Sequence, residues 1–366
     1  MERRITLLNE APPSHIVQAA GTGNSQEGMA MKAYRIGRFT GADGLVLTEE
    51  ETPRPGDGQI LVRLRAASLN YRDSLIIKGQ FGPLVPANII PLSDGAGEVR
   101  AVGGGVTRFA VGDRVMPIFN PHWLAGKRPI DSPSLGLGGE CDGTLAEYIV
   151  VDEIRAVRIP DHLSFEEAAT LPCAAVTAWS ALVQQEPPFP GETVLTQGTG
   201  GVSIFALQFA RLFGARVIAT SSSDDKIARL RALGAHETIN YRTTPDWDVA
   251  VKELTGGRGA DAIVEVGGAG TLARSFRASH ANTRIAIVGM VAGASGGEGF
   301  DFMSWVASTY RTSVGSRDDF ERMNRAMAFH HLKPVVDRVF GFGEVRQAFD
   351  YFDAKTYFGK VVISLD

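Results

Sequence analysis

Glycines and small polar residues after Thr193 are spaced so that they could hold a phosphate-bearing ligand. A short apolar run, Thr193–Thr196, is followed by GTGGVS at residues 198–203, and apolar residues then recur at helical spacing until Gly214. A glycine turn between a strand and a helix leaves backbone N–H groups unpaired at the positive end of the helix, where a pyrophosphate is stabilised. The alternative is a purely structural glycine turn. The pattern matches the dinucleotide fingerprint with Ser203 in place of the third glycine, and the expected contacts are Gly198, Thr199, Gly200, Gly201 and Val202.

A second set of residues could recognise one further phosphate. The strand at 215–220 ends in hydroxyl-bearing residues, Lys226 stands one helical turn beyond them, and Tyr241 follows the third strand. NAD-binding chains carry an acidic residue about 20 positions after the first glycine, and a carboxylate there repels a 2′-phosphate. Asp224 and Asp225 argue against a phosphate site, but acidic residues at a helix start can cap it and face away. We therefore expect NADPH rather than NADH, held by Ser221, Ser222, Lys226 and Tyr241.

The elements that position these residues alternate between strand and helix. After the first strand and its helix, the pattern predicts strands at 215–220, 238–240, 261–265, 284–288 and 312–315, and helices at 224–233, 246–254 and 270–278. Such alternation is typical of a parallel, doubly wound α/β sheet, and six strands match two mononucleotide-binding halves. Gly267, Gly289 and Ser316 are expected at the ends of later strands, where such sheets bind ligands.

The earlier part of the chain has a different pattern. Short strands separated by glycine turns are predicted at Lys32–Ile36, Leu45–Leu47, Ile60–Ala66, Gly95–Val102 and Leu145–Val151, which indicates a β-rich, barrel-like unit. A long loop at Pro117–Gly143 is either a surface flap or a wall of the substrate pocket. A helix is expected at Asp319–Phe329, and a closing strand at Gly359–Ser364 that returns to this unit.

Composition narrows the classes of function. With 366 residues the chain is long for one core, so two domains are expected. A net charge of -4 and the lack of a basic run do not indicate binding to nucleic acid or to an anionic membrane. No apolar stretch is long enough to span a bilayer. Two cysteines cannot build a disulfide framework, which suits a reducing cytoplasm.

Several motifs occur together and in order. Residues 66–73 read AASLNYRD, residues 91–99 PLSDGAGEV, residues 112–115 GDRV and residues 171–179 LPCAAVTAW. With the glycine turn, they resemble the medium-chain dehydrogenase/reductase superfamily, in its branch of zinc-independent alcohol dehydrogenases and quinone oxidoreductases. The resemblance implies a GroES-like catalytic domain at 31–157 and 318–366 and a Rossmann NADP(H)-binding domain at 158–317. Residues 1–30 would be an N-terminal extension outside the resemblance.

Departures from the zinc enzymes of this superfamily are informative. Zinc alcohol dehydrogenases have a Cys at the place of Asn70 and a His-Glu pair at the place of Ser93-Asp94, and only Cys173 falls where a further ligand would be. One thiolate and an amide cannot supply the three ligands of a catalytic zinc. We therefore expect no metal, and Cys173 as a packed residue.

Without zinc, the chemistry must come from the nicotinamide and from hydrogen-bonding side chains. Related reductases place the segment at residues 70–73 beside the nicotinamide, so the candidate catalytic residues are Asn70, Tyr71 and Asp73, with Asn70 also a candidate contact of the ribose. Tyr71 offers a phenolic O–H as donor or acid, whereas Asp73 and Asp94 could instead form a charge cluster with Arg72. The resemblance also places Thr177 near the nicotinamide ribose.

The expected protein is an NADPH-dependent oxidoreductase that acts on quinones or on carbon–carbon double bonds conjugated to a carbonyl. A zinc-independent alcohol dehydrogenase is the alternative within the enzymes. A non-catalytic NADPH-binding sensor or structural protein is the alternative of another class. A homodimer is expected through the sheet edge near Arg284–Met290 or Thr312–Ser316, because edge pairing covers unpaired backbone groups.

Overall fold

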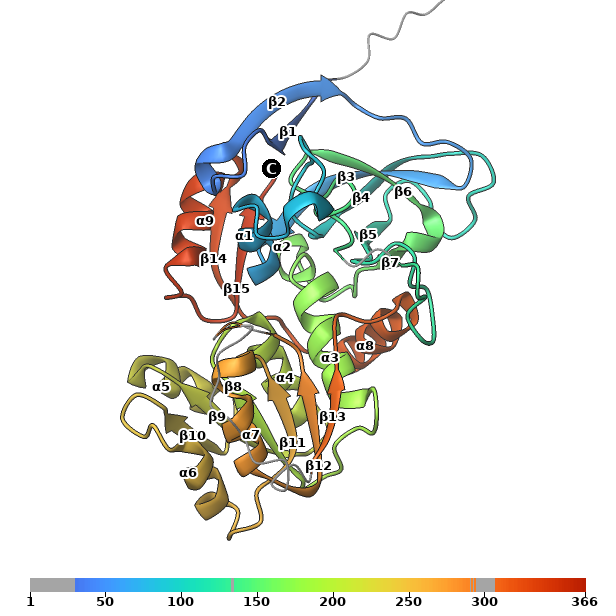
Figure 1. Cartoon of the computed structure of the whole chain (residues 1–366). Coiled ribbons are helices and arrows are strands. Elements are labelled where there is room, and N and C mark those ends of the chain that lie inside the picture. The colour runs from blue at the N-terminus through green and yellow to red at the C-terminus, as the bar shows by residue number, and fades with distance from the viewer. Residues whose placement is uncertain (1–29, 133–134, 290, 292, 294–306) are drawn as a thin grey trace, which may run out of the picture.

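A computed structural model describes residues 30–132, 135–289, 291, 293 and 307–366. The predicted N-terminal extension lies, except for Ala30, outside the described residues. Within the described part of the chain, no helix has the length and apolar character that crossing a membrane requires. A β-rich unit and a parallel-sheet unit lie one above the other in Figure 1, with α3 (Val176–Val183) and α8 (Arg317–Phe329) beside the region where they meet.

The β-rich unit contains two sheets. β1 (Ala30–Ile36) and β2 (Leu45–Glu51) form an antiparallel pair. The larger sheet has the order β14-β15-β3-β4-β5-β7, and β6 also pairs with β3. Its strands are β3 (Gln59–Ser68), β4 (Asp94–Val102), β5 (Arg114–Pro117), β6 (Tyr148–Asp152), β7 (Ala156–Arg158), β14 (Val336–Gly341) and β15 (Lys360–Ser364). The predicted β-rich class is confirmed. The strands include the expected runs except at residues 145–147, because β6 begins at Tyr148.

The closing strand returns to the β-rich unit, as expected. β15 pairs with β3 in antiparallel register, Val362 opposite Ser68 and Ser364 opposite Ala66. β14 and α9 (Val345–Asp353) lie before it, and the sequence pattern did not indicate either element. This pairing brings the start of β15 next to the end of β3, and so next to α1 (Tyr71–Ile77).

The second unit is a six-stranded parallel sheet in the order β10-β9-β8-β11-β12-β13. Its strands are β8 (Thr193–Gln197), β9 (Arg216–Ser221), β10 (Glu237–Asn240), β11 (Ala260–Glu265), β12 (Ser279–Ile287) and β13 (Ser308–Arg311). The order reverses between β8 and β11, which is the switch point of a doubly wound fold. The predicted Rossmann-type class is therefore confirmed.

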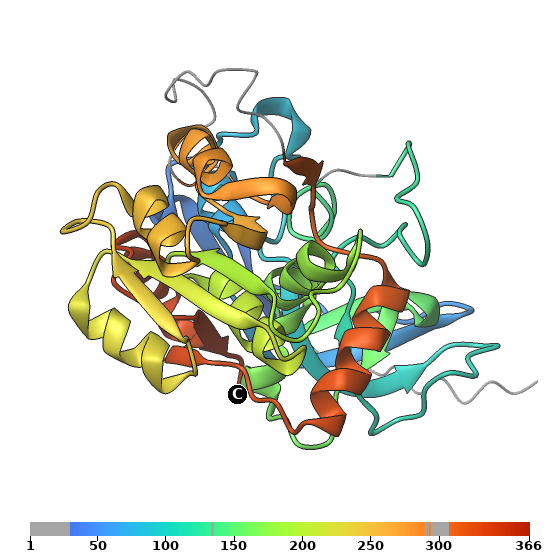
Figure 2. The same cartoon turned by 90° about the horizontal axis from the view of Figure 1, so that it is seen from below.

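Both faces of this sheet are buried, because successive residues of each strand point to opposite sides. Val194 and Val217 pack on the face covered by α3 and α4 (Gly201–Leu212). Leu195 and Ile218 pack on the other face, with residues of α6 (Trp247–Leu254) and α7 (Leu272–Arg277). In Figure 2, α7 in orange and α8 in red lie on opposite sides of the sheet. The remaining helices are α2 (Phe165–Ala168) and α5 (Asp224–Ala232).

Two expectations about the sheet edge are wrong. The last strand lies at Ser308–Arg311, and residues 312–315 form no strand. β12 is not an edge, because it pairs with β11 on one side and β13 on the other. The four-residue β13 has only one neighbouring strand among the described residues, so it forms one edge of this sheet, and β10 forms the other.

Candidate active site at the meeting of the two units

The glycine turn has the geometry that its sequence predicts. Gly198 has a φ of 74°, a left-handed conformation that favours glycine, and it directs the chain from β8 into α4. Gly200 is the N-cap of α4, and no side chain caps the first turn of the helix, which is the end at which an anion is stabilised. A Cβ atom added at Gly198 or Gly200 would meet no atom of the described residues within 4 Å. The turn thus leaves open space for a pyrophosphate.

Neighbouring residues of the turn have structural roles of their own. Gly201 lies against the β-rich unit, since a Cβ atom there would come within 2.7 Å of Lys360 Cδ. Ser203, at the position of the third glycine, donates a hydrogen bond from Oγ to the Gln197 carbonyl (2.6 Å). The substitution is therefore accommodated by a bond that ties α4 to the end of β8.

The candidate 2′-phosphate residues gather at the ends of β9 and β10. The Tyr241 N–H donates to the Ser221 carbonyl (3.0 Å), and Tyr241 is 40% exposed. Lys226 Nζ donates to the carbonyl of Lys355 at 3.1 Å. Asp224 accepts a hydrogen bond from Asn240 Nδ2 (2.8 Å), so this carboxylate is held against β10. Ser222 is half-buried beside them.

Later candidate contacts fall into two groups. Gly267 follows β11 and Gly289 follows β12, and both are closely packed. A Cβ atom added at Gly267 would overlap Thr271, and one added at Gly289 would lie 2.6 Å from the Val266 carbonyl oxygen. Ser316 is not at the end of a strand, which corrects that expectation. It is the N-cap of α8, and its Oγ accepts from the N–H of Asp319 (3.1 Å).

Thr177 is buried in α3. Its Oγ1 accepts a hydrogen bond from the N–H of Val314 (3.1 Å), a residue with a φ of 49°. The bond holds the strained segment after β13 against α3. The role of Thr177 at a ribose stays a prediction.

The segment at residues 70–73 forms the first turn of α1, next to the start of β15. Asn70 is the N-cap, and its N–H donates to Asp73 Oδ2 (2.9 Å). Arg72 pairs with Asp73 (2.7 Å) and also donates to the Leu135 carbonyl (2.6 Å). Burial raises the pKa of Asp73 to about 6, and the Arg72 guanidinium opposes this rise. Asp73 is fully buried, so its position suits a group that orders α1 and, through Arg72, the long loop.

Tyr71 differs from its neighbours in exposure. Its ring is half-buried at the start of α1, with Lys355 Nζ 5.8 Å from the ring centroid. No described residue forms a hydrogen bond with its hydroxyl in this structure. The phenol is therefore available to a ligand.

A lysine that sequence reasoning missed occupies the centre of the site. Lys360 is 2% exposed, and its ammonium donates to the Leu69 carbonyl (2.7 Å) and to Asn70 Oδ1 (2.6 Å). It lies 3.8 Å from Asp94 Oδ2. Burial lowers the pKa of Lys360 and raises the pKa of Asp94, and the attraction between the two groups opposes both shifts. The expected pairing of Asp94 with Arg72 is thus wrong: the ion partner of Asp94 is Lys360.

Asp94 has further partners that fix its position. Ser93 Oγ donates to Asp94 Oδ1 (2.7 Å), and the N–H of Cys173 donates to Oδ2 (3.2 Å). The positions that correspond to zinc ligands in the zinc enzymes, at 70, 93–94 and 173, therefore do converge. They converge around the ammonium group of Lys360.

This set of donors does not fit a catalytic zinc ion. An ammonium is bonded to the Asn70 oxygen that a metal would need, and burial raises the pKa of the Cys173 thiol far above its usual range. Zinc requires deprotonated thiolates and neutral or anionic ligands around it. Among the described residues, no three His, Cys, Asp or Glu side chains are grouped as a metal would require.

Comparisons with known proteins agree with both units. Residues 56–161 match a family model described as "Alcohol dehydrogenase GroES-like domain", and residues 201–328 match one described as "Zinc-binding dehydrogenase". The chain is 39% identical over 348 residues to the zinc-type alcohol dehydrogenase-like protein C1773.06c of Schizosaccharomyces pombe, covering 92% of this chain and 100% of that protein. It is 31% identical to a quinone oxidoreductase of Pseudomonas aeruginosa, covering 86% and 90%.

Solved structures extend this likeness to the arrangement of the chain. A putative alcohol dehydrogenase from Sinorhizobium meliloti superimposes with a TM-score of 0.85 at 41% identity, covering 92% of this chain and 99% of that one. A protein described as an NAD-dependent alcohol dehydrogenase gives 0.84 at 36% identity, covering 92% and 100%. The crotonyl-CoA carboxylase/reductase AntE, solved in complex with NADP, gives 0.79 at 25% identity, covering 92% and 95%. The neighbours therefore include proteins described with either nicotinamide nucleotide.

Proposed function

Because this chain belongs to the medium-chain dehydrogenase/reductase superfamily, we propose that it reduces quinones or carbon–carbon double bonds conjugated to a carbonyl, with NADPH and without zinc. The chain is an oxidoreductase of this superfamily. The observation that carries the zinc-free part is the Lys360 ammonium, which stands among the residues at zinc-ligand positions.

NADPH, when bound, supplies the hydride of the reaction. Reduction of an enone then places negative charge on the carbonyl oxygen of the substrate, and a fixed hydrogen-bond donor stabilises that charge in the transition state. Tyr71 is the proposed donor, because its hydroxyl has no described partner at the start of α1. Phenols are protonated at neutral pH and can give this bond or the proton itself.

Asn70 would assist from the adjacent position. Lys360 holds its Oδ1, so the amide is oriented; Nδ2 interacts with the Asp94 carboxylate but forms no hydrogen bond of good geometry with a described residue. This donor could reach a ribose hydroxyl or the substrate oxygen. Asp73 would act indirectly, by ordering the turn that carries both residues.

The preference for NADPH rests on the residues after β9 and β10. Ser222 follows β9, Lys226 lies on α5 and Tyr241 follows β10, while the Asp224 carboxylate at the start of α5 is bonded to Asn240. The Lys226 ammonium, now bonded to the Lys355 carbonyl, would turn toward a 2′-phosphate, because a doubly charged anion is a stronger partner than a carbonyl.

A panel of substrates tests the proposal. Enones, quinones, aldehydes and alcohols are each supplied with NADPH or NADP⁺, and the change in cofactor absorbance is followed. We expect turnover on enones or quinones that exceeds turnover on alcohols and simple aldehydes. Faster oxidation of alcohols would favour a zinc-independent alcohol dehydrogenase, and NADPH binding without turnover on any compound would favour a sensor.

We also propose a homodimer in the cytoplasm. Pairing of β13 with its two-fold copy would cover the outer backbone of Ser308–Arg311. Light scattering at micromolar concentration should give twice the mass of the chain, whereas the mass of a single chain would contradict the proposal. The free thiols of Cys141 and Cys173 suit the reducing compartment.

A further inference from the structure

Glu265 is a buried carboxylate at the switch point of the parallel sheet. It is the last residue of β11 and is fully buried, although no part of the proposed chemistry uses it. Its Oε1 accepts from the N–H groups of Gly267 (2.8 Å) and Gly268 (3.0 Å) and from Thr271 Oγ1 (2.5 Å). These bonds fold the turn after β11 around the carboxylate.

The other oxygen of Glu265 reaches across the switch point. Oε2 accepts from Gln197 Nε2 (2.8 Å), at the end of β8, and from Ser275 Oγ, on α7. The Gln197 carbonyl in turn accepts from Ser203 in the first turn of α4. One carboxylate therefore links the glycine turn after β8 to the turn after β11.

These five hydrogen bonds all come from uncharged groups. A buried carboxylate is costly to desolvate, so it persists only where its oxygens are satisfied by well-placed donors. Since dinucleotides lie across the switch point of doubly wound sheets, the two linked turns border the cofactor. The bonds therefore fix the distance between two cofactor-binding segments.

We propose that Glu265 is a positioning residue for the nicotinamide half of the cofactor, holding the turn at residues 266–271 in register with the glycine turn at 198–203. The inference rests on the proposed nicotinamide nucleotide. The adenosine half should depend on Glu265 much less, because in the mononucleotide-binding halves of this fold it belongs to β8, β9 and β10.

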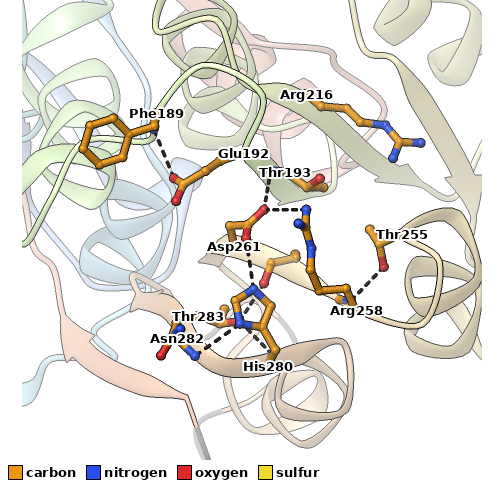
Figure 3. A network of polar contacts seen from close by, with 12 residues as sticks. Phe189, Glu192, Thr193, Arg216, Thr255, Arg258, Asp261, His280, Asn282 and Thr283 are labelled. Carbon is orange, nitrogen blue, oxygen red and sulfur yellow. Dashed lines mark hydrogen bonds and ion pairs between the residues drawn. The ribbon is translucent and has the colours of Figure 1, made fainter.

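A second carboxylate on β11 provides a matched control. Asp261, near the opposite end of the strand, accepts from the N–H of Thr193 (2.7 Å) and lies 3.0 Å from His280 Nε2 and 3.4 Å from Arg258 Nη2. Figure 3 shows these three contacts around the carboxylate. It also joins β11 to β8 and is 9% exposed. It does so at the amino ends of the strands, away from the ligand edge of the sheet, so its role is structural.

The experiment compares Glu265→Gln with Asp261→Asn in the full-length protein. Fluorescence or calorimetric titration gives Kd for NADPH and for adenosine 2′,5′-bisphosphate, which carries only the adenosine half. In Glu265→Gln an NH₂ group replaces one of the two carboxylate oxygens. In one orientation it faces the N–H groups of Gly267 and Gly268, and in the other it faces Gln197 Nε2, so a donor meets a donor and one of the two turns is displaced. We expect Kd for NADPH to rise about tenfold or more, and Kd for the bisphosphate to stay within about twofold.

Asp261→Asn should lower Tm while leaving both Kd values within about twofold of wild type. Equal weakening of both ligands by Glu265→Gln, or no weakening of either, would overturn the inference. If Glu265→Gln does not fold, Thr271→Val removes one donor to Oε1 and keeps the shape of the side chain. It should weaken NADPH a few-fold and spare the bisphosphate, and the opposite result would again overturn the inference.

The wild-type titration separates this inference from the proposed cofactor. Tight binding of NADH in place of NADPH would contradict the proposed preference, and the same comparison would then use NADH and AMP. Binding of neither nucleotide would overturn both the proposed function and the positioning role.

Discussion

Replacing Lys360 by methionine is expected to lower the free energy of unfolding by about 3–5 kcal/mol at neutral pH. The substitution keeps a long, unbranched side chain but removes the charge that lies 3.8 Å from the fully buried Asp94. It also leaves the Leu69 carbonyl and Asn70 Oδ1 without their donor. Urea unfolding of wild type and variant measures the loss.

The pH dependence of this loss of stability, together with a double variant, tests whether the unpaired charge of Asp94 is its cause. Without Lys360 the pKa of Asp94 rises further, so the loss of stability should shrink as the pH falls and Asp94 becomes protonated. Adding Asp94→Asn to Lys360→Met removes both charges and should restore much of the stability. A single Lys360→Met variant within about 1 kcal/mol of wild type at a pH of about 7 to 8 would show that the ion pair is not what holds the site together.

Tyr71→Phe is expected to lower turnover on the best enone or quinone by about a hundredfold or more, because loss of one oxyanion donor typically has this effect. The variant keeps the ring at the start of α1 and deletes only the hydroxyl. KM for NADPH should change little, since the donor acts on the substrate oxygen. Steady-state kinetics at saturating NADPH measure the change in kcat.

Tyr351→Phe is the control for this prediction. Its hydroxyl donates to Asp337 (2.7 Å) in the β-rich unit, on α9, and it has no place in the proposed site. It should keep wild-type turnover. If Tyr71→Phe also keeps near-normal turnover, the assignment is wrong and the donor is Asn70 Nδ2, a backbone N–H or water.

Local pattern predicts much of the parallel sheet correctly. Strands β8 and β11 each contain a short apolar stretch, Val194-Leu195 and Ala262–Val264, which is buried because both faces of the sheet are covered. The glycine at 198 marks a turn with a left-handed conformation that favours glycine. The pattern places β13 too late in the chain, at 312–315 instead of Ser308–Arg311. This strand is short and has no continuous apolar run, so periodicity gives it little signal.

The centre of the site could not be found from local pattern. Lys360 opens an apolar strand, Lys360–Ser364, and an amphipathic lysine at a strand end is ordinarily solvated. Its burial follows from the pairing of β15 with β3, which brings Lys360 to Asn70 across a sequence separation of 290 positions. Asn70 and Asp94 are both buried in the fold, and it is this burial, which local pattern does not predict, that requires a cationic or hydrogen-bonding partner.

The outcome for single candidate residues also depends on whether local pattern or tertiary structure decides their contacts. Ser316 precedes Asp319 by three residues, which is the spacing of a capping box. This spacing indicates a helix start at Ser316 rather than the end of a strand. The expectation that Asp94 pairs with Arg72 rests on opposite charges in neighbouring motifs, whereas tertiary structure gives Asp94 the ammonium of Lys360 instead.

We propose that this protein transfers hydride from NADPH without a metal. The most direct test is turnover of an enone or quinone by protein treated with a strong chelator and dialysed, with zinc measured by elemental analysis in the same sample. We expect unchanged kcat in zinc-free protein, and kcat/KM with NADPH well above kcat/KM with NADH. Stoichiometric zinc whose removal abolishes turnover and whose return restores it would contradict metal-free hydride transfer.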